Sequence, residues 1–102
     1  MKLDDFKWMT KYNGVRTSAI GGQIVLDFGK YQLSIIDDGY GRDDYLYEIG
    51  AFAAEDGVAT SMVELPGITA EGDTVKGHLT KKDVDLIIKK LYSITTKRPI
   101  QV

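Results

Sequence analysis

The sequence predicts an α+β fold, in which an antiparallel meander sheet of four or five strands packs against a C-terminal amphipathic helix, with a short helix at the N-terminus. Two observations carry this prediction. Residues 23–53 alternate apolar and polar side chains around tight-turn residues, which is typical of paired antiparallel strands. Residues 80–93 repeat aliphatic side chains at the spacing of one helical face. A length of 102 residues fits a single domain over 1–102, with 94–102 as an irregular tail.

The first predicted hairpin is centred on Gly29 and Lys30. Glycine at the first position of a two-residue loop favours a type II′ turn, because glycine tolerates positive φ. This turn aligns three apolar pairs on one face of the sheet: Phe28 with Tyr31, Leu26 with Leu33, and Ile24 with Ile35. Hydrophobic pattern and turn chemistry therefore agree on one register.

Two further strands are predicted over residues 45–53 and 58–65, joined by a tight turn at Asp56-Gly57. Gly50 and Ala51 leave room on the first of these strands for the C-terminal helix to approach. Residues 68–79 are expected to form a connection to that helix. His78 lies in this connection, and a packed or hydrogen-bonded role is expected for it, since a lone histidine makes a poor metal site or catalytic base.

The C-terminal helix is predicted to begin after Thr80, which pairs with Asp83 in a variant of the capping box. Its buried face comprises Val84, Ile87, Ile88 and Leu91. The N-terminal helix is predicted over residues 3–12, from the three-residue spacing of Leu3, Phe6 and Met9, with Asn13-Gly14 ending it. Trp8 and Tyr12 are expected to pack on the sheet, with an aromatic contact surface as the alternative, and residues 15–20 to add an edge strand.

Charge is unevenly distributed along the chain, although the net charge is only −2. Residues 1–36 hold five bases and three acids, and residues 76–102 hold seven bases and two acids. Residues 37–75 hold ten acids, with Arg42 as their one basic neighbour. The middle of the chain is therefore strongly acidic, and the ends either neutralise it on folding or leave it as a surface.

The candidate binding residues come from this acidic middle segment. They are Asp37, Asp38, Tyr40, Arg42, Asp43 and Asp44 in one loop, with Glu55 and Asp56 in the next turn. The spacing of the acids does not match an EF-hand calcium loop. A phosphate cradle formed by the glycines and Arg42 is opposed by the acids. The two remaining interpretations are an acidic loop that meets a basic partner and a solvated connection with no binding role.

Several function classes are disfavoured by composition. The chain has no cysteine, which excludes disulfides, thiolate metal sites and cysteine nucleophiles. Its residues form no nucleophile–base set and no phosphate loop of standard spacing, so we expect no enzyme activity, no metal and no cofactor. No apolar run is long enough for a membrane span, and the N-terminus does not resemble a signal peptide. A cytoplasmic location is expected.

The segment from Phe28 to Leu91 resembles a group of small accessory proteins encoded by tailed bacteriophages. The resemblance rests on YEIGAF at residues 47–52, a threonine-containing turn, and DTVKGHLTKKDVDLIIKKL at residues 73–91. It implies a viral accessory product that acts in the cytoplasm of the infected bacterium, and it implies no catalytic residue.

These observations lead to one principal function hypothesis and two alternatives. The principal hypothesis is a non-catalytic module whose acidic loops bind a basic host or defence protein. The first alternative is a small-ligand binder or sequestering protein for nucleotides, with Tyr40 stacking and Arg42 and basic helix residues supplying charge. The second is DNA binding through Lys81, Lys82, Lys89, Lys90, Lys97 and Arg98, which a pI near 5.3 disfavours. Two exposed sheet edges also allow a homodimer.

Overall fold

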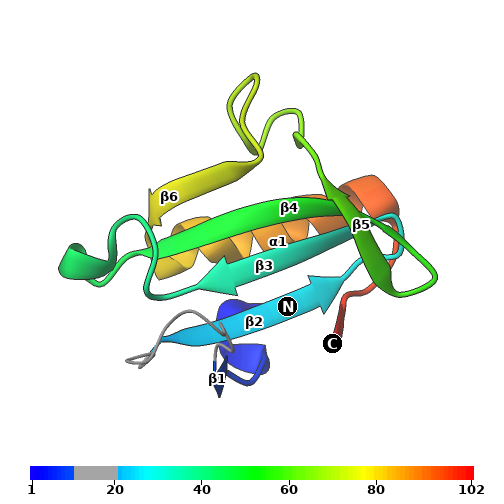
Figure 1. The fold of residues 1–102 in the computed structure, drawn as a ribbon. Helices are drawn as coiled ribbons and strands as arrows, with labels where there is room; N and C mark the ends of the chain where they lie inside the picture. The colour runs from blue at the N-terminus through cyan, green and yellow to red at the C-terminus, as the bar shows by residue number, and fades with distance from the viewer. Residues whose placement is uncertain (11–20) are drawn as a thin grey trace.

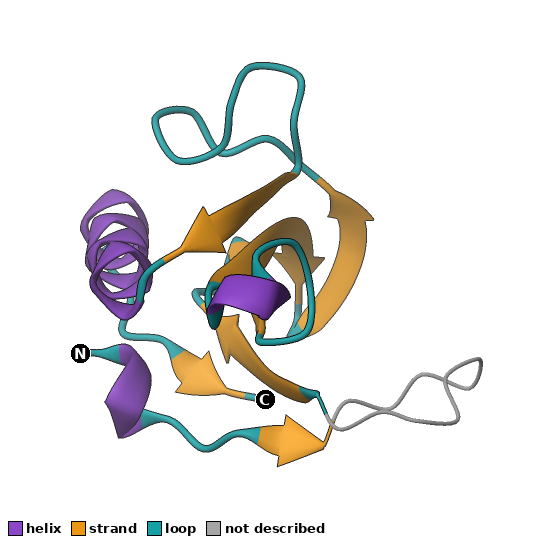
Figure 2. Ribbon diagram, turned by 90° about the vertical axis from the view of Figure 1, so that its left-hand side faces the viewer, coloured by secondary structure: helices purple, strands orange, loops and turns teal. Residues whose placement is uncertain are grey.

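The computed structural model describes residues 1–10 and 21–102 and confirms the α+β prediction (Figure 1). Its elements in chain order are η1 (Leu3–Asp5), β1 (Met9–Thr10), β2 (Gly22–Asp27), β3 (Tyr31–Ile36), η2 (Arg42–Asp44), β4 (Tyr47–Glu55), β5 (Val58–Met62), β6 (Val75–Leu79), α1 (Lys81–Thr95) and β7 (Ile100–Gln101). The described strands form one antiparallel sheet, and α1 lies on one side of it (Figure 2). None of the described helices is long and apolar enough to cross a membrane.

The β2–β3 hairpin has the predicted register. Ile24 lies opposite Ile35 and Leu26 opposite Leu33, and the Phe28 N–H donates to the Tyr31 carbonyl over 2.8 Å. Gly29 has a φ of 89°, whereas Lys30 keeps a negative φ. Positive φ at Gly29 alone excludes a type I′ turn, which needs positive φ at both positions, and the Lys30 N–H donates to the Phe28 carbonyl over 3.2 Å within the turn.

Three strands form the middle of the sheet, and each outer edge of this trio pairs with two shorter strands. β2 pairs with β1 near Gln23 and with β7 near Leu26. β4 pairs with β6 through residues 47–50 and with β5 through residues 52–55. Ala51 lies at this second junction, where its N–H donates to the Thr74 carbonyl and its carbonyl accepts from the Val63 N–H, each over 3.0 Å.

Helix α1 forms as predicted and closes the core. The Thr80 side chain accepts from the Asp83 N–H over 3.1 Å, and the Asp83 carboxylate accepts from the Thr80 N–H over 2.9 Å, which completes a capping box. The four predicted helix residues, Val84, Ile87, Ile88 and Leu91, are all buried. They share one core with buried residues of β2, β3 and β4 and of the first hairpin turn: Ile24, Leu26, Phe28, Leu33, Ile35, Ile49 and Ala51.

The predicted helix over residues 3–12 is wrong for the part that the structure describes. Only Leu3–Asp5 is helical, as a 3₁₀ turn, and Met9–Thr10 is a strand paired with β2. Contacts with distant residues override the local spacing: the Leu3 N–H donates to Asp85 of α1 over 2.7 Å, and the Lys7 N–H donates to Gln101 over 2.8 Å. Tyr12, the Asn13-Gly14 helix end and the edge strand over 15–20 lie outside the described residues.

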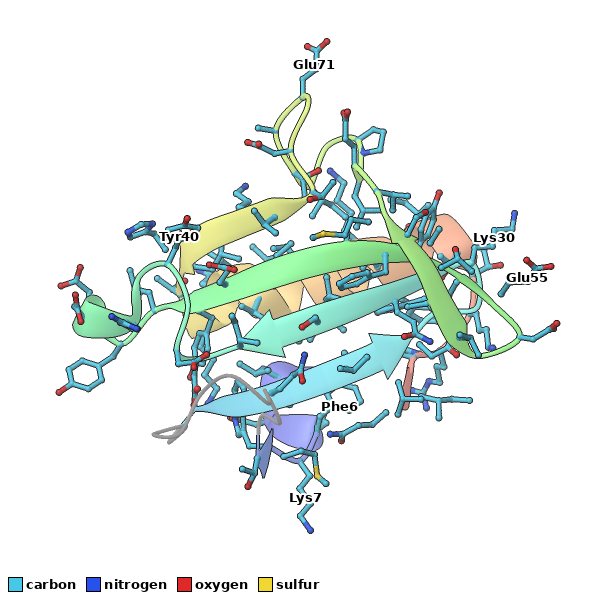
Figure 3. All side chains as sticks on the ribbon, in the orientation of Figure 1. Phe6, Lys7, Lys30, Tyr40, Glu55 and Glu71 are labelled. Atoms are coloured by element: carbon cyan, nitrogen blue, oxygen red, sulfur yellow. The ribbon has the colours of Figure 1, made fainter. Side chains whose placement is uncertain are left out.

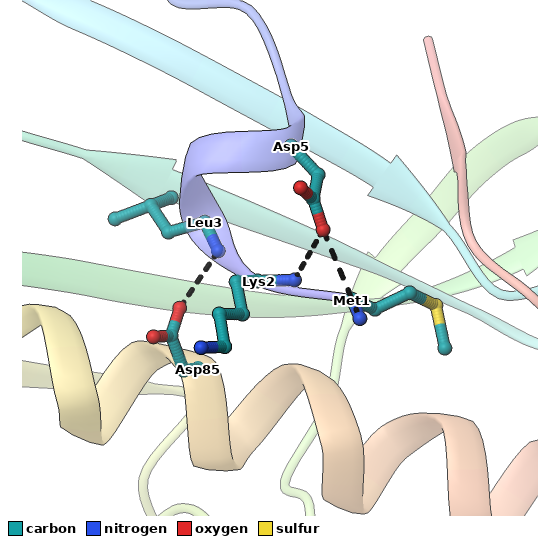
Figure 4. A network of polar contacts seen from close by, with 5 residues as sticks. All are labelled: Met1, Lys2, Leu3, Asp5 and Asp85. Atoms are coloured by element: carbon teal, nitrogen blue, oxygen red, sulfur yellow. Dashed lines mark hydrogen bonds and ion pairs between the residues drawn. The ribbon is translucent and has the colours of Figure 1, made fainter.

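Figure 4 shows how this first turn docks on α1. Besides the bond from Leu3 to Asp85, the Asp5 carboxylate accepts from the Lys2 N–H over 2.8 Å and lies 3.7 Å from the N-terminal amine. Asp4 forms an ion pair with Lys81, and this contact raises the pKa of the Lys81 ammonium. Leu3 is buried beneath the turn. The N-terminal segment is therefore part of the core rather than an appendage.

Other expectations need correction at strand boundaries. Residues 68–79 are not only a connection, because Val75–Leu79 forms β6 beside β4. The strand over 45–53 begins at Tyr47, since Arg42–Asp44 forms a 3₁₀ turn before it, and the strand over 58–65 ends at Met62. Within the tail over 94–102, Ile100–Gln101 pairs with β2.

The structure separates the roles of Gly50 and Ala51. Ala51 faces the core, whereas a Cβ at Gly50 would meet Phe52 and Val75 on the face away from α1. Only Ala51 therefore leaves room for the helix, because successive strand residues point to opposite faces.

Replacing Leu91, which is fully buried on α1, should lower the free energy of unfolding. Leu91→Ala should cost about 2–5 kcal/mol through lost transfer energy and the cavity left behind. Urea denaturation at neutral pH measures this change. Leu86→Ala is the matched control, because Leu86 lies on the same helix but is 56% exposed. Equal losses for the two variants would contradict the orientation of α1.

The capping box should make stability depend on pH. Hydrogen bonds from Thr80 hold the pKa of Asp83 below its usual value, so the folded state favours the carboxylate. This stabilisation is present above the pKa of Asp83 in the unfolded chain and is lost as the pH falls through the lower folded-state value. Asp83→Asn should therefore lower the thermal midpoint at pH 7, and the difference from wild type should shrink in acid.

Asp83→Glu is the control, because glutamate is the usual residue at this position of a capping box. It should keep the pH dependence that Asp83→Asn loses. A difference in thermal midpoint between the wild type and Asp83→Asn that stays constant into acid would contradict the role assigned to the carboxylate.

Candidate functional site

The structure places the eight predicted binding residues at two ends of the sheet. Asp37, Asp38, Tyr40, Arg42, Asp43 and Asp44 lie together in the segment 37–46 between β3 and β4, which we call the acidic loop. Glu55 and Asp56 lie at the other end of β4. A nine-residue strand separates the two groups by about 26 Å, at the usual rise per residue. They therefore do not form one continuous surface.

A third group of acids projects elsewhere. Figure 3 shows Tyr40, Glu55 and Glu71 on three different projections of the molecule, with Glu71 at the tip of the loop between β5 and β6. The acidic middle of the sequence is thus divided among separate loops. Among these, the acidic loop brings together six of the eight predicted residues.

Hydrogen bonds attach the acidic loop to the neighbouring strands. The Asp37 carboxylate accepts from the Gly22 N–H of β2 over 2.7 Å. The Tyr40 N–H donates to the Glu48 carboxylate of β4 over 2.7 Å, and the Tyr40 carbonyl accepts from the His78 N–H of β6 over 2.9 Å. The loop is therefore fastened to three strands of the sheet, which reduces the entropy that a partner would have to remove on binding.

A tight turn at the tip of the loop exposes its charged and aromatic groups. The Arg42, Asp44 and Tyr45 N–H groups donate to carbonyls three residues earlier, over 3.0–3.1 Å. Tyr45 has a φ of 58°, and its side chain is 91% exposed. The Tyr40 side chain is 68% exposed, and Asp43 and Asp44 are exposed as well. The loop thus presents two tyrosine rings beside two aspartates.

Close backbone approach at β6 sets the position of Tyr40. A Cβ at Gly77 would lie 2.5 Å from the Tyr40 Cβ and 3.0 Å from the Tyr40 carbonyl oxygen. Gly77 and the next residue, His78, form an irregularity in the pairing of β6 with β4, and His78 has a φ of 55°. The bulge turns the His78 N–H toward the loop, so the lone histidine supports the loop through its backbone. The sequence predicted a packed or hydrogen-bonded role for His78 but did not indicate this partner.

A shallow groove of about 610 Å³ runs along the acidic loop. Its lining includes four carboxylates, from Asp38, Asp43, Asp44 and Glu48, against one guanidinium, that of Arg42. The Arg42 Nε lies 3.9 Å from the Asp43 carboxylate, which partly neutralises both. The groove therefore favours cations over anions. Within residues 1–10 and 21–102, no cluster of three or more His, Asp or Glu side chains is arranged to hold a metal ion.

Two aromatic side chains lie behind the loop. The rings of Trp8 and Tyr47 stack with centroids 5.6 Å apart and planes 15° from parallel. Both are half-buried and pack against the core. This arrangement confirms the expectation that Trp8 packs on the sheet. It also supports the start of β4, where the acidic loop ends.

The basic residues proposed for DNA binding are partly engaged within the protein. Lys81 pairs with Asp4, and the Lys90 ammonium donates to the Gly67 carbonyl over 2.7 Å. Lys82, Lys89, Lys97 and Arg98 are exposed along and beyond α1. These six bases lie on other elements than the acidic loop.

Substituting Gly77 should displace the acidic loop. Gly77→Ala should destabilise the protein by about 1–3 kcal/mol, because the new methyl group overlaps the Tyr40 backbone. Gly50→Ala is the matched control on the neighbouring strand, where a Cβ would make ordinary contacts at 3.7–3.8 Å. Urea denaturation and the fluorescence of the loop tyrosines measure both effects. Similar results for the two variants would show that β6 does not position the loop.

Comparison with known proteins gives no family for the chain. No protein-family model matches the sequence, and the searches of curated proteins and of solved structures found no match. The resemblance to phage accessory proteins therefore stays a prediction, and the function is inferred from the residues described above.

Proposed function

We propose that the protein is a non-catalytic binding module whose acidic loop docks on a basic surface of a partner protein. The observation that carries this proposal is the pairing of exposed tyrosines with exposed aspartates on a loop fastened to three strands. Tyrosine is among the residues that contribute most to protein–protein affinity, because its ring buries a large area and its hydroxyl keeps a hydrogen bond.

The charge of the loop also supports a basic partner. The loop and the Glu48 carboxylate that lines its groove carry five acids and one base. A surface of this sign speeds the approach of a basic partner and repels acidic ones. Each exposed contact is worth little by itself, so the tyrosines supply affinity and the aspartates supply orientation and rate.

We propose the class of partner from the predicted resemblance to phage accessory proteins. In that context, a basic protein of the bacterial host or of its defence systems, acting in the cytoplasm, is the expected partner. Its nucleic-acid-binding surface would have the required charge, so the acidic loop would compete with nucleic acid.

Nucleotide binding is the second candidate. Tyr40 and Arg42 both line the 610 Å³ groove, where a base could stack and a phosphate could pair. The four carboxylates in the same lining oppose the phosphate, since like charges in a shared site raise the cost of binding. The geometry therefore supports the protein partner better than a nucleotide.

Neutralising the tip of the loop should weaken capture of the partner. The double variant Asp43→Asn with Asp44→Asn should reduce capture from bacterial lysate by at least about fivefold at low salt, because two exposed charges are lost. Tyr45→Asn should reduce it as well, and asparagine tolerates the positive φ at this position. Quantitative mass spectrometry of the captured proteins measures both.

The control variant also removes two negative charges, but from a loop other than the acidic loop. Glu71→Gln with Asp73→Asn, in the loop between β5 and β6, should leave capture unchanged. Capture that is equally reduced by this control, or that does not weaken with added salt, would contradict docking through the acidic loop.

A further inference from the structure

The β5 strand is the most exposed strand of substantial length in the described sheet. All five of its residues, Val58–Met62, are exposed, with Val58 at 64% and Met62 at 49%. It pairs with β4 on one edge, and no other described strand pairs with it. Its sequence, VATSM, contains no charge, proline or glycine. Such an edge is a ready template for another strand.

The other outer strands carry features that block edge pairing. β6 contains Lys76 and the bulge at Gly77-His78, and β1 and β7 are two residues long. β7 also follows Pro99. Short length, lysine, proline and bulges are the devices by which sheets protect their edges. β5 has one extra residue, Thr60, where its register with β4 shifts, and this bends the strand without adding charge.

The pairing pattern shows which backbone groups of β5 face outward. The Ala54 N–H of β4 donates to the Lys30 carbonyl, so the backbone groups of Ala54 point toward β3 and away from β5. Ala59 lies opposite Ala54 on β5 and is therefore not hydrogen-bonded to it. The N–H and carbonyl of Ala59 point to the outer side of β5, away from β4. The Val63 N–H donates to Ala51, so the preceding residue, Met62, also faces outward. Ala59 and Met62 therefore offer backbone donors and acceptors to an incoming strand.

The edge is held firmly in place. Asp56 and Gly57 have φ values of 51° and 81°, as in a type I′ turn, which fits the twist of the two strands that it joins. The Gln32 side chain, which is buried, donates to the Gly57 carbonyl over 2.9 Å and fastens the hairpin over the end of β3. Figure 1 shows the β4–β5 hairpin folding across this end of the sheet. A partner strand would meet a preformed edge.

Acids flank the uncharged strand at both ends. Glu55 and Asp56 precede it and Glu64 follows it, all exposed, and no described cation lies within ion-pairing distance of them. A second β5 strand at this edge would bring the same acids with it, so that Glu55 and Asp56 of one copy would approach Glu64 of the other, and like charges close together across paired strands are destabilising. The edge is thus unsuited to a second copy of this chain.

We propose that β5 is a docking edge for an extended segment of a partner protein, with an uncharged β-forming middle and Lys or Arg at both ends. Main-chain bonds to Ala59 and Met62 would give affinity, and Glu55, Asp56 and Glu64 would select the basic flanks. This edge lies at the opposite end of β4 from the acidic loop, so the inference does not depend on the function proposed for that loop.

A synthetic peptide with five alternating threonine and valine residues and two lysines at each end tests the proposal. The peptide should shift the amide resonances of Ala59 and Met62, and the same peptide with glutamate ends should bind at least about tenfold more weakly. Ala59→Pro removes an outward N–H without breaking the β4 pairing and should weaken binding at least about fivefold. Ala59→Val keeps that N–H and is the matched control.

Two further variants separate this edge from the acidic loop. Glu55→Gln with Asp56→Asn and Glu64→Gln should abolish the preference for lysine ends. Asp43→Asn with Asp44→Asn should leave peptide binding unchanged. Equal binding of the two peptides, shifts confined to residues 37–46, or concentration-dependent dimers that Ala59→Pro dissociates would each overturn the proposal.

Discussion

The fold depends on one packing constraint: the aliphatic stripe of α1 must lie on the face of the sheet that carries Ile24, Leu33 and Ile49. These side chains are fully buried and form the centre of the core. A single helix covers one face only, so the opposite face needs another cover. The curled β4–β5 hairpin supplies part of it, with Gln32 buried beneath and bonded to the turn. The placement of β5, and therefore of its open edge, follows from this asymmetry.

The parts of the fold that sequence patterns predicted are those in which local chemistry and burial agree. The β2–β3 hairpin has turn glycine and apolar pairs in one register, and α1 has a cap and a four-residue face. β1 and β7 are two residues long, which is too short to show the alternation of apolar and polar side chains that marks a strand. β6 contains a glycine, a lysine and a bulge, which interrupt this alternation. The N-terminal segment has a helix-like spacing, but its hydrogen-bond partners lie 82 and 94 residues away. Local sequence carries no signal of such contacts.

Some features of the candidate site could likewise be predicted from the sequence, and others could not. Sequence identified the acidic segment and the loop that holds Tyr40 and Arg42, because charge and glycine content are visible residue by residue. It did not reveal that Glu55 and Asp56 lie at the other end of β4, since that depends on strand length and direction. Nor did it reveal Tyr45 as the most exposed aromatic ring, because the 3₁₀ turn replaces the expected start of the strand. Alternation along a strand would have placed Tyr45 beside Tyr47, on the core side.

The late position of α1 in the chain has a consequence for biosynthesis. The three central strands are complete by residue 55, whereas the residues that cover their apolar face extend to Leu91. At roughly 5–20 residues per second, a ribosome needs about 2–7 s to add the intervening segment. The strands therefore leave the ribosome before α1 does, and until α1 packs on them their hydrophobic face has no cover, a surface of the kind that chaperones recognise.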